Sequence, residues 1–378
     1  MHTFDVIIVG GGFLGLSTAY QLAKTGVRTL VLEAGDIGSG SSSACSGRAQ
    51  VCEGHLDSLN LALIRNGIIK HETLQEELDY DYEWRRVGLF ALLPTQKYWD
   101  LWQERASVLT SNGIPTEVID PCSLQKAEPN MNTTGLLGAA YSLEGMLNPL
   151  KFTRAYARAA ERFGAKIIGN SPVTGMQVQS GRVISVTTPG GIFYADKIAI
   201  MAGAWVAVVA RLAGVELPLQ STHGESMATE SIPRLVYNNI DFSDGYEVIH
   251  GESSAVTLGV HPEPDGTLNI AEALIQTPRL HQGVSAWGLT AIARELVRVF
   301  PFMAKVRVIR GWGRPTSFTP DEEPMVGWVP QLDNLYVATS LMQTITTVPQ
   351  VSEWMAMAIQ GQTPPVSLDA YSPARFFN

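Results

Sequence analysis

Three glycines near the N-terminus have the spacing Gly10-x-Gly12-x-x-Gly15, which is typical of a site for the pyrophosphate of a dinucleotide. The first glycine of such a site permits a tight turn, the second lets the backbone approach the pyrophosphate, and the third lets a helix pack closely against a sheet. That helix would direct free N–H groups and a partial positive charge at the phosphates. Glu33 follows at the separation at which a carboxylate accepts hydrogen bonds from ribose hydroxyls. Together these residues indicate a dinucleotide-binding site.

The segments around the glycines have the order that such a site requires. Residues 4–9 are an apolar run typical of a buried parallel strand, residues 14–24 have helical spacing and end before Gly26, and residues 29–32 predict a second strand. The alternative is a glycine-rich turn in another kind of α/β protein. We favour the dinucleotide site because the strand, the helix and the acidic residue are all present.

Three features favour FAD over NAD as the dinucleotide. The motif lies at the very N-terminus, and it occurs once, so a second site for a nicotinamide nucleotide is not indicated. The loop GSGSSSACSGR, residues 38–48, follows Glu33 and offers backbone and hydroxyl donors to the far side of a pyrophosphate. A tightly held flavin that takes hydride directly from a substrate is the simplest chemistry for this combination.

The composition is that of a globular protein without strong attraction to polyanions. The chain has 378 residues, of which 45% are apolar, a formal net charge of −9 and a pI near 5.3, and these values argue against nucleic acid as a partner. Cys45, Cys52 and Cys122 are too few and too scattered for a disulfide framework or a zinc site. We therefore expect no metal site and a reducing compartment.

The sequence also bears on location. No apolar run has the length of a transmembrane helix, and the first residues lack the basic region of a signal peptide. We therefore expect a cytoplasmic protein without a transmembrane segment. A peripheral position at the inner membrane is left open.

The remaining segments predict a mixed α/β protein with two interleaved domains. Residues 215–274 are rich in strands, and elsewhere helices are expected near 56–78, 95–111, 148–163, 206–213, 285–299 and 348–359 and strands near 86–93, 176–178, 182–187, 192–195, 197–201, 306–311, 325–327 and 335–338. We expect a Rossmann-like FAD-binding domain built from discontinuous segments and an antiparallel-sheet substrate domain. The first would comprise residues 1–80, 145–220 and 310–378, and the second residues 81–144 and 221–309.

Five stretches resemble, in order, the D-amino acid oxidase superfamily of FAD enzymes, in its glycine oxidase and sarcosine oxidase branch: DVIIVGGGFLGLSTAYQLAKTGVRTLVLEAG, EGMLNPLKFTRAYARAAERFGAKI, AIMAGAWVAVVARLAGVELPL, GRPTSFTPDEEPMVG and NLYVATS. Within this branch the chain most resembles the β subunits of heteromeric opine oxidases and dye-linked proline dehydrogenases. The resemblance implies oxidation of the C–N bond of an amino or imino acid of the opine, proline, glycine or sarcosine type. Hydride would pass from the α-carbon to flavin N5, and water would hydrolyse the resulting imine.

The resemblance places the anchor for the substrate carboxylate at Arg314, in GWGRPTSFTPDEEP. A planar guanidinium matches a carboxylate in geometry and charge. The alternative is a structural arginine paired with Asp321 or Glu322, and Arg310 is the second candidate for the anchor. A strong general base is not required if the amine binds neutral.

Three further residues are candidates with open alternatives. Tyr246 falls in the segment where related oxidases present a tyrosine to the substrate, and a core tyrosine is the alternative. His223 could titrate beside the flavin, although a satisfied core or surface histidine is favoured over that role. Arg48, at the end of the serine-rich loop, could pair with the pyrophosphate or the flavin, with a plain surface arginine as the alternative.

The cofactor contacts come from the glycine motif, the serine-rich loop and the positions that the resemblance places near adenine and flavin. They are Gly10, Gly12, Phe13, Leu14, Gly15, Glu33, Ala34, Ser41, Ser42, Ser43, Arg48, Ala49, Gln50, Val51, Val173, Ala202, Gly203, Trp205, Gly313, Leu341, Met342, Gln343, Thr344 and Ile345.

The segment from Ser340 to Thr347 departs from the simple oxidases of this family, which are rich in Gly and His there. The helix that follows would still direct its positive end at the flavin pyrimidine ring. The bulkier residues favour a subunit that passes electrons to partner chains bearing FMN or iron–sulfur centres. A self-sufficient oxidase that makes hydrogen peroxide is the second hypothesis, and a flavoprotein scaffold without catalysis is the third.

Overall fold

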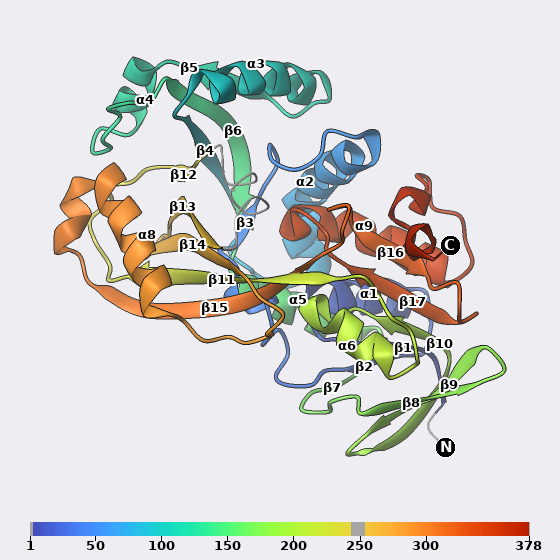
Figure 1. Cartoon of the computed structure of the whole chain (residues 1–378). Coiled ribbons are helices and arrows are strands. Elements are labelled where there is room, and N and C mark those ends of the chain that lie inside the picture. Colours follow the sequence, from blue (N-terminus) through green and yellow to red (C-terminus); the bar gives the residue numbers. More distant parts are fainter. Residues whose placement is uncertain (1–2, 243–253, 378) are drawn as a thin grey trace.

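The computed structural model describes residues 3–242 and 254–377, which form two sheets with helices packed on them (Figure 1). The first sheet has eight strands in the order β16-β17-β10-β1-β2-β7, with β9 paired to β10 and β8 paired to β9. Its strands are β1 (Thr3–Val9), β2 (Thr29–Leu32), β7 (Lys166–Ile168), β8 (Gly175–Gln179), β9 (Arg182–Thr188), β10 (Gly191–Ile200), β16 (Met325–Trp328) and β17 (Leu335–Thr339).

The register of the parallel strands brings the glycine motif and the acidic residue together. Val9, at the end of β1, is paired with Leu32 of β2 and with Ile200 of β10. Gly10 and Glu33, which follow β1 and β2, therefore lie at the same carboxyl edge of the sheet. Ligands of open α/β sheets bind at this kind of edge.

Alternate residues of β1 enter different cores, as a strand that is buried on both faces requires. Ile7 and Val9 pack with the β8–β10 meander and with α6 (Val206–Arg211). Val6 and Ile8 pack on the other face, in a core shared with α1 (Phe13–Lys24), α2 (Ser58–Leu78), α5 (Pro149–Arg162) and α9 (Thr344–Ile359).

The second sheet has nine strands in the order β15-β11-β14-β13-β12-β4-β6-β3, with β5 paired to β6. Its pairs are antiparallel except that β12 runs parallel to β4. The strands are β3 (Arg48–Ala49), β4 (Arg85–Leu93), β5 (Thr116–Ile119), β6 (Gly138–Met146), β11 (Gln220–Thr229), β12 (Asn239–Phe242), β13 (Ser254–Pro262), β14 (Leu268–Gln276) and β15 (Val308–Phe318). The helices that accompany it are α3 (Gln96–Ser111), α4 (Pro121–Ala127) and α8 (Ala286–Val299).

The mixed α/β fold class predicted from the sequence is confirmed, and some element bounds are corrected. Residues 192–195 and 197–201 were expected as two strands, but 191–200 form the single strand β10. The last helix begins at Thr344, before the expected 348. The division into discontinuous domains stays a prediction. Strand β3 and most of β15 join the second sheet, although they lie in segments that the sequence assigned to the FAD-binding domain.

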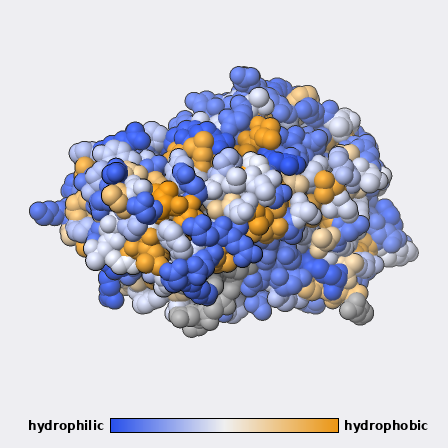
Figure 2. All heavy atoms as spheres, turned by 90° about the horizontal axis from the view of Figure 1, so that it is seen from above, coloured by the Kyte–Doolittle hydropathy of each residue, from blue (hydrophilic) through white to orange (hydrophobic). Residues whose placement is uncertain are grey.

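The surface in the view of Figure 2 is mostly hydrophilic, with apolar side chains gathered in separate patches. Single exposed apolar side chains such as Ile69 and Ile309 are ordinary for a folded protein. Among the described residues, no helix is both long and apolar enough to cross a membrane.

Candidate active site

A cavity of 1270 Å³ is lined by residues from both sheets. Its volume exceeds the roughly 300–1,000 Å³ of sites for drug-sized ligands. One part lies at the glycine motif and the serine-rich loop, and another lies among Asp241, His261, Glu272 and Arg314, which come from β12, β13, β14 and β15. The cavity can therefore hold a long ligand and a small one end to end.

The glycine motif leaves the N-terminus of α1 open to this cavity. A Cβ at Gly10, which has φ +119°, would collide with the carbonyl of Met201, and a Cβ at Gly15 would collide with the carbonyl of Gly10. A Cβ at Gly12, the N-cap of α1, would lie 2.8 Å from Oγ of Ser42. Glycine at these positions thus permits the tight turn after β1 and the close packing of α1, and the backbone of Gly10 and Gly12 lines the cavity.

Glu33 and the serine-rich loop complete this end of the cavity. The carboxylate of Glu33 accepts hydrogen bonds from the amides of Gly11 (2.6 Å) and Gly35 (2.9 Å). Ser42 accepts one from the amide of Phe13 at 3.0 Å, so its hydroxyl sits over the start of α1. These contacts place a carboxylate and a hydroxyl at the positions where ribose and phosphate oxygens are expected.

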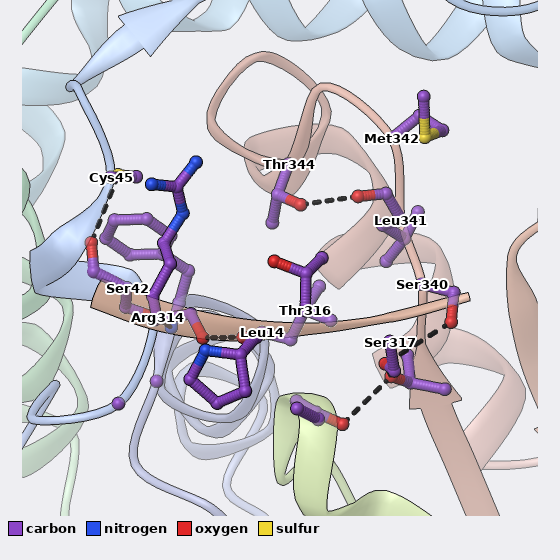
Figure 3. Close-up of a pocket in the computed structure, with 18 of the residues that line it drawn as sticks. Leu14, Ser42, Cys45, Arg314, Thr316, Ser317, Ser340, Leu341, Met342 and Thr344 are labelled. Carbon is purple, nitrogen blue, oxygen red and sulfur yellow. Dashed lines mark hydrogen bonds between the residues drawn. The ribbon is translucent and has the colours of Figure 1, made fainter. Parts of the chain in front are cut away.

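The serine-rich loop is also attached to the second sheet. The hydroxyl of Ser41 donates to the carbonyl of Pro315 at 2.5 Å, and the indole of Trp312 donates to the carbonyl of Ala44 at 2.7 Å. Figure 3 shows Arg314 extending from β15 into the space between Cys45 and the segment that carries Thr344. Strand β15 therefore positions both the loop and a cation in the cavity.

The start of α9 forms another wall, lined by residues 341–345. Ser340 and Gln343 have φ values of +60° and +44°, in the left-handed region that favours glycine. Thr346 donates to the carbonyl of Gln50 at 2.6 Å, and the side-chain amide of Gln343 donates to the carbonyl of Glu53. The N-terminal end of this helix is thus held against the cavity.

Arg314 is placed in the cavity, and its partner there is Glu272. Nη2 of Arg314 donates to Oε2 of Glu272 at 2.8 Å, and Nη1 is 3.4 Å from Oγ of Ser226. Asp321, considered as a partner from the sequence, binds Arg375 at 2.7 Å instead. Arg314 is thus available to a ligand only in competition with a carboxylate.

Arg310, the second candidate, lies on the same strand but outside the cavity lining. Its side chain is exposed, with its guanidinium 5.5 Å from the ring centre of Trp312. The structure therefore favours Arg314 over Arg310 as the anchor.

Arg48 lines the cavity and is bound by carboxylates. Its guanidinium is paired with Glu144 and Asp241, and it donates to Glu53 at 2.8 Å. Burial raises the pKa of the Glu144 carboxyl, while the charge of Arg48 opposes that shift. Because the guanidinium already has these partners, a pairing with a pyrophosphate or flavin stays a prediction.

His261, on β13, is a site residue that the sequence analysis missed. Its side chain is 3% exposed and lines the cavity, and its Nδ1 has no hydrogen-bond partner among residues 3–242 and 254–377. Burial, and then the charges of Arg48 and Arg314, lower its pKa to about 3, so the imidazole is neutral at physiological pH. Nothing in the local sequence separates this histidine from the others.

His223 is buried outside the cavity lining, in line with the core histidine that the sequence favoured over a role beside the flavin. Its Nε2 lies 2.8 Å from the carbonyl of Gly283, and its ring stacks on His281 at 3.8 Å. Burial and His281 lower its pKa. Gly313, expected at the cofactor, instead leaves room for this ring, since a Cβ there would lie 2.5 Å from His223 Nε2. Tyr246 lies outside the described residues.

Most of the other expected cofactor contacts do line the cavity. Those that line it are Gly10, Gly12, Phe13, Leu14, Glu33, Ala34, Ser41, Ser42, Arg48, Gln50, Val173, Ala202, Gly203, Trp205, Leu341, Met342, Gln343, Thr344 and Ile345. Those outside the lining are Gly15, Ser43, Ala49, Val51 and Gly313. Ala49 is fully buried in β3, and Ser43 turns its hydroxyl to the carbonyl of Gly38 at 2.6 Å. No cluster of side chains suited to a metal ion occurs within residues 3–242 and 254–377.

Comparison of the chain with known protein families identifies its family. The model of the family described as "DAO: FAD dependent oxidoreductase" matches residues 5–358. The chain belongs to this family. The DAO family uses FAD, so the resemblance inferred from the sequence is confirmed at the level of family, cofactor and oxidoreductase class.

Relatives of this DAO-family chain include longer proteins. It is 29% identical over 378 residues to 4-methylaminobutanoate oxidase (formaldehyde-forming) of Paenarthrobacter nicotinovorans, covering 98% of this chain and 45% of that protein. It is 29% identical over 350 residues to sarcosine oxidase subunit beta of Arthrobacter sp, covering 89% and 81%. Glycine oxidase from Geobacillus kaustophilus shares the fold, with a TM-score of 0.89 and 23% identity over 100% of both chains.

The residues of this DAO-family member fit FAD. The side-chain-free approach at Gly10 and Gly12 suits the pyrophosphate, and Glu33 suits the ribose hydroxyls. Val173, on the segment before β8, lines the same end, while residues 341–345 at the start of α9 and Gln50 line the part toward Arg314. The length of the cavity beyond the pyrophosphate cradle leaves space for a flavin and a small substrate.

Proposed function

We propose that the chain oxidises the C–N bond of a small amino or imino acid that carries a carboxylate. The observation that carries this proposal is Arg314, a guanidinium inside the cavity whose other end is the dinucleotide cradle. Sarcosine and 4-methylaminobutanoate, named in the descriptions of relatives, are carboxylates with a secondary amine, and they support the proposed class. The proposed substrate class also includes amino and imino acids of the glycine and proline types.

The residues of the cavity would bind and orient such a substrate. FAD, when bound, supplies the acceptor for the hydride that leaves the α-carbon. Arg314 offers its planar donor pair to the substrate carboxylate, for which Glu272 competes. His261 stays neutral, so it can share a hydrogen bond with the substrate without adding charge. The amine must reach the cavity neutral for its lone pair to form the C=N bond as the hydride leaves.

A substitution at Arg314 tests the carboxylate anchor. Arg314→Ala should raise the KM for sarcosine-type substrates by about tenfold or more, because a hydrogen bond to a charged group contributes roughly 1.5–3 kcal/mol. Arg314→Lys should restore part of the loss. Steady-state kinetics of the FAD-loaded protein measures this, with flavin absorbance showing that the cofactor is retained.

The matched control for this experiment is Arg310→Ala. Arg310 lies four positions earlier on the same strand but outside the cavity lining, so its loss should leave KM unchanged. An unchanged KM in Arg314→Ala would contradict the anchor role. A purified chain that holds no flavin would contradict the proposed reaction.

The chain is further proposed to work as the catalytic subunit of a heteromeric dehydrogenase. The similarity to sarcosine oxidase subunit beta over 81% of that subunit favours this arrangement. Electrons would then pass to partner chains bearing FMN or iron–sulfur centres. The same assay with oxygen and with an artificial dye separates the alternatives, since a self-sufficient oxidase would make hydrogen peroxide from the isolated chain and a subunit would react well only with the dye.

A further inference from the structure

The end of the cavity around Arg48 and Arg314 holds more carboxylates than guanidinium groups. The carboxylates paired with these two arginines are Glu53, Glu144, Asp241 and Glu272. Among residues 3–242 and 254–377, four carboxylates therefore face these two guanidiniums before any ligand binds.

Arg105, on α3, adds a third guanidinium to the cavity lining, and its charge acts on Glu53. It lines the cavity, but its guanidinium donates to the backbone carbonyls of Cys52 and Gly54. These contacts hold the loop that precedes α2 and leave the Arg105 side chain on the wall formed by α3. Glu272 and Asp241 stay the carboxylates paired with Arg314 and Arg48.

His261 is a second sign that a polar ligand binds at this end. A Cβ on Gly259 would meet both Oδ1 of Asp241 and Nε2 of His261, so these two side chains adjoin the same backbone position. The free Nδ1 of His261 has no partner within the described ranges, 3–242 and 254–377. Buried ring nitrogens are normally hydrogen-bonded, so a ligand is expected to supply this partner.

We propose that this end of the cavity selects a substrate that carries a second cationic nitrogen, and that Glu272 and Asp241 determine this specificity. The inference rests on the proposed function and narrows its substrate class to basic N-alkyl amino acids. Opines with two carboxylates are disfavoured.

The reason lies in the pairing of Arg314 with Glu272. A substrate carboxylate that binds Arg314 takes a donor from Glu272 and leaves a largely buried carboxylate short of a counter-charge. A cationic nitrogen on the same substrate supplies that charge, whereas a second carboxylate would meet Glu272 and Asp241 with the same sign. Charge complementarity thus favours the dibasic ligand and rejects the dicarboxylic one.

The test compares ligands that differ in side-chain charge: N-methyl-lysine, N-methyl-norleucine and N-methyl-glutamate. Each is also used as its α-methyl analogue without the N-methyl group, which has no hydrogen on the carbon that carries the α-nitrogen, so that binding to the FAD-loaded protein is measured by the change in flavin absorbance without turnover. We expect the lysine analogue to bind about tenfold or more tightly than the norleucine analogue, and the glutamate analogue to bind most weakly.

Substitutions then assign the preference to residues. Glu272→Gln keeps a hydrogen-bond acceptor for Arg314 but removes the charge, so the advantage of the lysine over the norleucine analogue should fall several-fold. Glu263→Gln is the matched control. Glu263 is paired with Arg85 at 2.7 Å and is 20% exposed, close to the 2.8 Å and 16% of Glu272, but it lies outside the cavity lining. That variant should keep the full preference.

Each outcome bears on one of the two proposals. Equal affinity for the three analogues, tighter binding of the glutamate analogue, or binding of none of them would overturn the inference, whatever the variants do. Binding in the expected order without flavin reduction by the oxidisable ligands would leave the inference standing and count against the proposed oxidation. Rapid oxidation of N-methyl-glutamate in preference to the other two ligands would support the proposed oxidation and count against the inference.

Discussion

Ser340 and Gln343 adopt a left-handed backbone conformation without being glycine. Their φ values of +60° and +44° cost roughly 1 kcal/mol or more for a residue with a side chain. The side-chain amide of Gln343 is bonded to the carbonyl of Glu53, while the hydroxyl of Ser340 has only a 3.5 Å contact with that of Ser317. The path of the chain before α9 is therefore one that glycine would follow, although the segment contains none. This weakens the argument that its bulkier residues alone indicate a complex subunit.

Ser340→Gly should accordingly stabilise the protein. The expected gain in the free energy of unfolding is up to about 1 kcal/mol, because relief of the left-handed strain, roughly 1–2 kcal/mol, exceeds the roughly 0.5–1 kcal/mol that the larger unfolded-state entropy of glycine costs. Urea unfolding followed by tryptophan fluorescence measures the change. Ser340→Ala is the control, which loses the same hydroxyl but keeps a Cβ and should gain nothing. Equal stability of the Gly and Ala variants would contradict this account.

At the scale of elements, α9 is tied to α2 through its own proline. Pro349 lies inside α9 and has no N–H, so the carbonyl of Ile345 lacks its normal helical partner. Nε2 of His71 on α2 fills this place at 2.8 Å, and the imidazole is stacked on Trp84. To donate to this carbonyl, Nε2 must carry a hydrogen, which both the neutral Nε2–H tautomer and the protonated ring provide. Full burial of the ring favours the neutral form.

This link predicts a pH dependence of stability. Burial lowers the pKa of His71 from 6.5 to about 4, so its contribution is fully present above pH 6.5 and is lost as the pH falls toward 4, where the unfolded chain binds a proton that the folded chain does not. His71→Gln keeps a side-chain amide as donor but does not titrate. Its free energy of unfolding should fall less steeply between pH 6.5 and 4, by up to about 1.4 kcal/mol per pH unit. Parallel curves for the two proteins in urea unfolding would refute the assignment.

At the scale of the whole molecule, the cofactor cavity is also the junction of the two sheets. The serine-rich loop after β2 is bonded to β15 of the second sheet through Ser41 and Trp312. Gln282, in the segment before α8, adds a bond to the carbonyl of Ser39 at 2.7 Å. A ligand that fills the cavity therefore contacts both sheets and stabilises their association.

Removal of FAD should lower the melting temperature, and added FAD should raise it in a concentration-dependent way. Each tenfold excess over the dissociation constant contributes about 1.4 kcal/mol of stability when the ligand binds only the folded protein. Thermal unfolding of the apoprotein across an FAD series measures this. FMN, which lacks the adenosine that reaches toward Glu33, is the comparison and should stabilise less. A melting temperature that does not respond to FAD would contradict the placement of the cofactor at this junction.

The sequence by itself determined the dinucleotide end of the site, because that end is local. Gly10, Gly12 and Gly15 are close in the chain, and Glu33 follows the next apolar run, so the sequence could expect them at one site; the structure pairs the two strands and bonds the Glu33 carboxylate to the amide of Gly11. The family, the cofactor and the mixed α/β class also followed from these patterns.

Only the tertiary structure decided the charged end, because its residues are far apart in the chain. Arg314 meets Glu272, and Arg48 meets carboxylates from β6 and β12, through strand pairing that no local pattern encodes. For the same reason the sequence did not single out His261, which lines the cavity, whereas His223 is enclosed against His281. Which side chains face a common space depends on long-range register, and that is a property of the folded chain.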